Sequence, residues 1–84
     1  MIVTITLTYQ GQSVSGTEEC EDTEEGIESF DFYWGDGNFA CDCNRSRWAI
    51  QHGADWPELE CSGLDLIAAK AVTPDGRVLF DENE

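Results

Sequence analysis

The first ten residues of the chain alternate between apolar and polar side chains. A period of two, with β-branched residues at most positions, is typical of a strand that buries one face. We therefore predict a strand over residues 1–10. Its buried face carries Val3, Ile5, Leu7 and Tyr9.

Residues 29–34 (SFDFYW) alternate in the same way. The Gly-Asp-Gly-Asn sequence at 35–38 is rich in residues that tolerate a positive φ, which favours a hairpin turn followed by a returning strand over 39–43. In this interpretation Tyr33 lies on the polar face of the strand, beside Asp31. The opposite face, which we expect in the core, carries Phe30, Phe32 and Trp34.

The rest of the chain is less regular. Residues 11–16 are predicted to form a loop, and the acidic segment 17–28 lacks apolar periodicity, which allows a short exposed helix at most. Residues 45–52 fit a short helix or a strand, and both stay open. Residues 64–73 contain good helix formers, but the Thr-Pro-Asp-Gly turn that ends them favours a hairpin with a strand over 77–80.

These patterns predict one domain over residues 1–84, mainly β: a small antiparallel sheet of four or five strands, or an α+β variant with one short helix. A chain of 84 residues and 9.4 kDa buries only roughly 60% of its unfolded surface, so its core is thin. No stretch approaches the ~18 apolar residues of a membrane span, and the first residues resemble a strand rather than a signal peptide. We therefore expect neither a membrane protein nor a secreted precursor.

Charge is the strongest functional signal. Eighteen acidic residues against four basic ones give a formal charge of −14, and residues 1–44 contain ten of the acids and none of the bases. Nucleic acids and anionic membranes repel such a chain, whereas a basic protein surface attracts it. The alternative is that the acidic run is only a solvated loop or face.

We predict a partner-binding surface around the acidic run, since tyrosine bordered by carboxylates is typical of protein–protein contacts. The candidates are Glu18, Glu19, Glu21, Asp22, Glu24, Glu25, Glu28, Asp31, Tyr33 and Asp36.

The four cysteines, Cys20, Cys41, Cys43 and Cys61, could bind a structural zinc ion. Their spacing argues against it, because zinc knuckles pair ligands two to four residues apart and only Cys41 and Cys43 are close. We expect no cofactor, and reduced, mostly buried thiols. Zinc and disulfides remain the alternatives.

No enzyme is expected. His52 is the only histidine, so a Cys–His or acid–base mechanism would have to run through it, and no nucleophile, phosphate-binding or metalloprotease motif is present. The Asp36-Gly37-Asn38 sequence lacks the spacing of a calcium loop.

The sequence from Phe32 to Arg45 (FYWGDGNFACDCNR) resembles a block found in short, uncharacterised phage-encoded proteins. This resemblance covers fourteen residues and implies a cytoplasmic, phage-derived product, without assigning a catalytic or binding residue. In size and charge the chain is also similar to phage inhibitors of host defence, which include anti-CRISPR and anti-restriction proteins.

We therefore expect a non-enzymatic, acidic interaction module in the cytoplasm of a host bacterium. It would inhibit a host defence protein by occupying its basic nucleic-acid-binding surface, as a DNA mimic, without contacting nucleic acid or membrane itself. The alternatives are a small zinc- or cysteine-stabilised structural or regulatory module, and a phage virion or assembly component.

Overall fold

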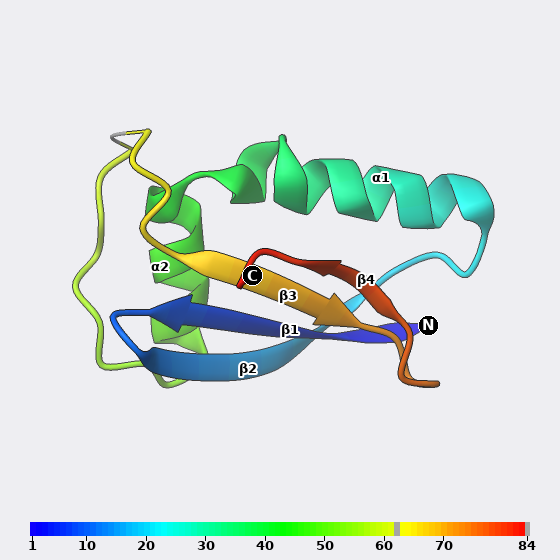
Figure 1. The fold of residues 1–84 in the computed structure, drawn as a ribbon, viewed down its shortest axis with the longest axis horizontal. Helices are drawn as coiled ribbons and strands as arrows, with labels where there is room; N and C mark the ends of the chain where they lie inside the picture. The colour runs from blue at the N-terminus through cyan, green and yellow to red at the C-terminus, as the bar shows by residue number, and fades with distance from the viewer. Residues whose placement is uncertain (62, 84) are drawn as a thin grey trace.

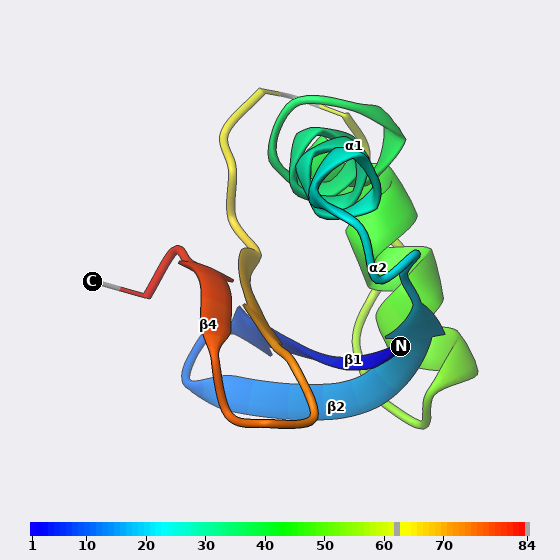
Figure 2. The same ribbon diagram turned by 90° about the vertical axis from the view of Figure 1, so that its right-hand side faces the viewer.

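Two helices pack on one face of a four-stranded antiparallel sheet in the computed structural model, which describes residues 1–61 and 63–83 (Figures 1 and 2). The strand order is β2-β1-β3-β4, so β2 and β4 form the edges. The fold is thus α+β, and the prediction of a mainly β domain is corrected by a second helix. The elements are β1 (Ile2–Tyr9), β2 (Gln12–Glu19), α1 (Glu24–Gly35), the 3-10 turn η1 (Asn38–Ala40), α2 (Asp42–Gln51), β3 (Ala68–Val72) and β4 (Val78–Asp81).

The alternating N-terminal segment forms β1, as predicted, but residues 11–16 are not a loop. Gln10 and Gly11 both have positive φ, the geometry of a two-residue hairpin turn whose twist matches that of the strands. The chain therefore returns at once as β2, with Ile5 opposite Gly16 and Leu7 opposite Val14.

The second hairpin is confirmed: β3 and β4 pair antiparallel around the predicted Thr-Pro-Asp-Gly turn. β3 also pairs with β1, with Ala71 opposite Ile5 and Ala69 opposite Leu7. Both alanines are fully buried, and their small side chains leave room above the sheet for the helices.

The predicted strand over 29–34 is wrong, because this segment belongs to α1. The Thr23 hydroxyl caps the helix by accepting a hydrogen bond from the Gly26 N–H, and acidic residues occupy the first turn, where the helix dipole favours them. Phe30 and Trp34, four residues apart, share the buried face of the helix. Phe32 points away from that face and is 63% exposed, so its predicted place in the core is also wrong.

The predicted turn at 35–38 and returning strand over 39–43 are replaced by a link into η1 and by the start of α2. The open choice for 45–52 is settled as helix, since α2 spans Asp42–Gln51. Trp34 lies at the centre of the aromatic core: its ring stacks on Phe39 at 4.6 Å and meets Trp48 edge-on at 5.8 Å. The buried apolar residues are Val3, Ile5, Leu7, Cys20, Phe30, Trp34, Trp48, Ala49, Trp56, Ile67, Ala69 and Ala71.

Two buried charged residues of α2 fix the segments around it. Arg45, 3% exposed, donates hydrogen bonds to the backbone carbonyls of Trp34, Phe39 and Ile67. Asp42 accepts hydrogen bonds from the N–H groups of Leu66 and Ile67 at 3.0 and 3.1 Å. Within the described residues, no helix has the length and apolar character needed to cross a membrane.

Candidate functional site

The carboxylates of α1 form an exposed ridge. Glu24, Glu25, Glu28 and Asp31 are all exposed. Glu28 lies three or four residues from each of the other three, which places its side chain about 5–6 Å from theirs on the helix surface. α1 itself contains no basic residue.

Two adjoining open hollows, of about 450 and 480 Å³, lie along one side of this ridge, and Glu25, Ser29 and Tyr33 line both. Phe32 and Tyr33 are 63% and 42% exposed there. The Tyr33 ring packs 5.2 Å from Phe39, which anchors it to the core. We call this surface the acidic face; it consists of Glu19, Glu21, Glu25, Glu28, Phe32 and Tyr33.

Three of the four basic side chains lie away from the acidic face, and the fourth, Arg77, shares a hollow with Glu28, which belongs to that face. Arg45 is buried and pairs with Glu82 at 2.7 Å, Arg47 pairs with Glu58 at 3.0 Å, and Lys70 lies 4.0 Å from Asp81. Arg77 lines a separate hollow at the N-terminal end of α1, together with Asp22, Glu24 and Glu28. The carboxylates at that end of the helix are partly offset by Arg77, whereas none of the described residues that line the two hollows of the acidic face is basic.

The structure places the predicted partner-binding residues as follows. Nine of them are exposed: Glu19, Glu21, Asp22, Glu24, Glu25, Glu28, Asp31, Tyr33 and Asp36. Glu18 differs, because it is half-buried and accepts a 2.6 Å hydrogen bond from the indole N–H of Trp48. Sequence reasoning missed Phe32, which shares the helix surface with Glu25 and Glu28; only the helical spacing of seven and four residues would have found it.

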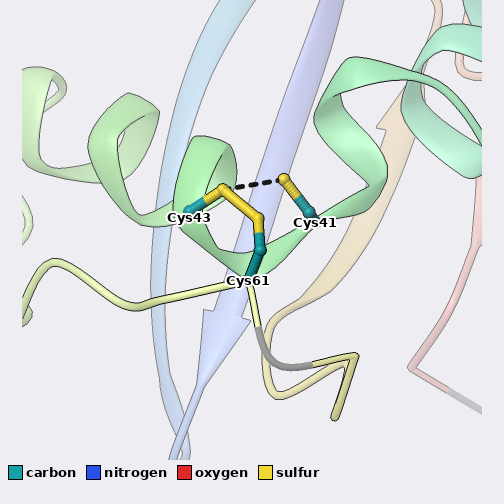
Figure 3. Close-up of side chains that lie close together, drawn as sticks. All are labelled: Cys41, Cys43 and Cys61. Atoms are coloured by element: carbon teal, nitrogen blue, oxygen red, sulfur yellow. Dashed lines mark hydrogen bonds between the residues drawn. A yellow bond between two sulfur atoms is a disulfide. The ribbon is translucent and has the colours of Figure 1, made fainter.

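Three of the four cysteines gather where α2 begins (Figure 3). The sulfur atoms of Cys41, Cys43 and Cys61 all lie within 4.8 Å of one another, and no other such group of Cys, His, Asp or Glu occurs among residues 1–61 and 63–83. Cys43 and Cys61 form a disulfide, and the Cys41 thiol donates to Cys43 Sγ at 2.9 Å. We call these three residues the cysteine cluster.

The expectation of four reduced, mostly buried thiols is therefore corrected. Cys43 and Cys61 are bonded, Cys41 is half-buried, and Cys20 alone is a buried free thiol. Cys20 lies near the carbonyls of Glu21 and Gly26, and its burial raises the pKa of its thiol. Cys20 stands apart from the cysteine cluster, so a zinc site that uses all four cysteines does not form.

His52 does not join the cysteine cluster. Its ring stacks on Trp48 with the centroids 3.8 Å apart, and its Nδ1 lies 2.7 Å from the Trp48 carbonyl oxygen. The imidazole is thus held by α2 in a packing role.

Comparison with known proteins gives no match: no family model, no curated protein and no solved structure is similar to this chain.

Proposed function

We propose that this chain is a non-enzymatic binding module whose acidic face occupies a basic, nucleic-acid-binding surface of another protein. The observation that supports this most directly is the acidic face itself, which presents four carboxylates beside two exposed aromatic rings, with no basic residue among the described residues that line its two hollows. A surface of this charge steers basic partners towards it.

The spacing of the carboxylates suits mimicry of a nucleic-acid backbone. From Glu24 to Asp31 the helix rises about 10.5 Å at ~1.5 Å per residue, and four carboxylates lie on that stretch: Glu25 and Glu28 of the acidic face, and Glu24 and Asp31 outside it. This amounts to one negative charge per about 3.5 Å of axis, close to the 3.4 Å per charge of one DNA strand. A groove that accepts phosphates would meet charges at a similar density.

Phe32 and Tyr33 supply the apolar part of the proposed contact. Carboxylates alone mainly accelerate association, whereas buried aromatic side chains provide most of the binding energy at protein interfaces. The Phe32 ring is the more exposed of the two, so a partner that covers it removes more apolar surface from water there. Tyr33 is already held in place against Phe39.

The resemblance of residues 32–45 to phage-encoded proteins points to a host bacterial protein as the partner. Occupying its nucleic-acid-binding surface would inhibit it, as expected of a defence inhibitor. A partner that handles nucleic acid and carries an apolar pocket within its basic surface fits the acidic face best.

Displacement from DNA tests this function. Bacterial proteins held on immobilised duplex DNA are challenged at low salt with the purified chain, and the released proteins are identified by mass spectrometry. The released protein is then purified, and its binding to the chain is measured at two salt concentrations. We expect a specific, salt-sensitive complex that excludes DNA.

Two double variants of equal charge change make the test specific. Glu25→Gln/Glu28→Gln alters the acidic face, whereas Asp55→Asn/Glu60→Gln alters exposed carboxylates of the segment after α2. We expect only the first pair to lose the displacing activity. Equal displacement by both variants, or no protein released by the unmodified chain, contradicts the proposal.

A further inference from the structure

We propose that the cysteine cluster, in its reduced form, is a three-thiolate site for a thiophilic metal ion such as zinc or Cu(I). This site is separate from the acidic face and does not depend on the proposed function. A structural disulfide needs two sulfur atoms, but here a third lies against the pair: Cys41 Sγ is 2.9 Å from Cys43 Sγ, and all three sulfurs lie within 4.8 Å. Soft thiolate ligands select zinc and Cu(I).

The fold holds Cys61 in place without the disulfide. The connection between α2 and β3 is tied to α2 on both sides of Cys61: the Leu59 N–H donates to Ser46 Oγ at 2.9 Å, and the Leu66 and Ile67 N–H groups donate to Asp42. Asp42 and Ser46 flank Cys43 on the helix. Opening the S–S bond therefore leaves the Cys61 sulfur beside Cys43 and Cys41.

The start of α2 also suits anionic sulfur. Cys41 is the N-cap residue of this ten-residue helix, and its side chain makes no capping hydrogen bond. The N-terminal end of a helix stabilises nearby negative charge, and Cys41 and Cys43 lie at this end of α2. Figure 3 shows these two sulfurs on the helix side and Cys61 on the facing connection.

The two states of the cysteine cluster exclude each other. A thiol reductant supplies two electrons and two protons, the Cys43–Cys61 bond breaks to give two thiols, and the reductant becomes its own disulfide. A metal ion then displaces the three thiol protons into the buffer. Zinc–sulfur bonds of about 2.3 Å place the sulfurs of a tetrahedral site about 3.8 Å apart, which is comparable with the 4.8 Å within which the three sulfurs already lie.

Metal titration of the reduced full chain tests the proposal. The protein is reduced, freed of reductant without air, and titrated with Co²⁺ as a spectroscopic probe, then with Zn²⁺ in competition. Cu(I) is tested in a separate titration against a coloured Cu(I) chelator. We expect one ion per chain and a sulfur-to-cobalt charge-transfer band that zinc abolishes; the more tightly bound ion identifies the preferred metal.

Single substitutions separate a metal site from a simple disulfide. Cys41→Ser leaves the Cys43–Cys61 pair intact and so preserves the fold, but it removes one ligand. We expect it to weaken Zn²⁺ and Cu(I) binding by more than about tenfold. Removing a residue that only hydrogen-bonds to a metal ligand already lowers metal affinity by about tenfold or more. Cys20→Ala is the matched control and leaves binding unchanged. Failure of the reduced chain to bind either ion at micromolar concentration overturns the proposal, and so does full-strength binding by Cys41→Ser.

Discussion

Arg45 and Glu82 lie 37 residues apart in sequence and form a two-pronged ion pair, with Nη1 and Nη2 donating to the two carboxylate oxygens at 2.7 and 3.1 Å. The pair joins α2 to the chain just after β4. Its members are unequal: the Arg45 side chain is 3% exposed and that of Glu82 is 38% exposed. Arg45 also donates hydrogen bonds to three backbone carbonyls, so the guanidinium connects α1, η1, α2 and the end of the sheet.

We expect Arg45→Met to lower the free energy of unfolding by about 3–5 kcal/mol, as found when one partner of a buried charged network is removed. Three backbone carbonyls, two of them in buried contacts, lose their donor. Glu82→Gln costs about 1 kcal/mol, because its carboxylate is partly solvated and the amide still accepts one bond. Urea unfolding of both variants measures the difference; equal losses would mean that the ion pair, and not the carbonyl contacts, makes Arg45 important.

We expect Asp42→Ala to destabilise the fold by about 2–3 kcal/mol, because it leaves the Leu66 and Ile67 N–H groups without their acceptor. In this variant, amide hydrogen exchange should become faster at Leu66 and Ile67, and it should increase more there than in β1. Asp31→Ala, which changes an exposed carboxylate of α1, is the control and should stay within about 0.5 kcal/mol of the unmodified chain. Unchanged exchange at Leu66 and Ile67 would contradict the role assigned to Asp42.

Gly16 is required for close packing between β2 and α2. A Cβ atom there would lie 2.7 Å from Trp48 Cη2 and would also overlap the His52 ring. We expect Gly16→Ala to cost about 1–3 kcal/mol, the range typical of overpacking. Gly35→Ala, where a Cβ meets nothing within 4 Å, should be neutral or slightly stabilising by thermal unfolding.

Substitution of Glu18 should lower stability, whereas substitution of Glu25 should weaken partner displacement. Glu18→Ala removes the acceptor of the Trp48 indole N–H and is expected to lower stability by about 1–3 kcal/mol while leaving partner displacement unchanged. Glu25→Gln should weaken displacement without a measurable change in unfolding. Measuring both quantities for both variants checks this; a binding loss at Glu18 equal to that at Glu25 would add Glu18 to the acidic face.

The turn between β3 and β4 should respond to acid. The Thr73 hydroxyl and the Arg77 backbone N–H lower the pKa of Asp75 below its ordinary value. A carboxyl whose pKa is lowered by folding stabilises the fold above its unfolded pKa and loses this effect as the pH falls through the folded value. We expect NMR titration to give an Asp75 pKa below that of the unfolded chain, and Thr73→Val to raise it. The same titration in urea is the control, and an unchanged pKa in Thr73→Val would show that the hydroxyl is not its cause.

The sequence was informative where local chemistry decides structure. Strict alternation over 1–10 predicted β1, and the Thr-Pro-Asp-Gly turn predicted the β3–β4 hairpin. The alternation over 29–34 wrongly predicted a strand, because six alternating residues also fit a helix. The segment is helical because a helix buries both Phe30 and Trp34 against the sheet. Thr23, which caps α1, and the acidic residues of its first turn were helix-start signals that the sequence prediction did not use.

The candidate sites were predictable only in part. Charge located the acidic face in the first half of the chain, but the pairing of Phe32 with Glu25 and Glu28 depends on the helix. Cys43 and Cys61 are 18 residues apart, and their approach depends on the hydrogen bonds of Asp42 and Ser46. Contacts of this kind form only in the tertiary structure, so the spacing of the cysteines in the sequence predicted neither the disulfide nor the cysteine cluster.

The position of β2 at an edge of the sheet has a consequence for the behaviour of many copies in solution. Its eight residues contain no lysine or proline, the residues that commonly prevent edge strands from pairing with another molecule. At pH 7 the formal charge is −14, so copies of the chain repel one another, and this repulsion prevents pairing through β2. Near the isoelectric point of about 4.1 the repulsion vanishes, and β2 becomes a template on which further copies can extend the sheet.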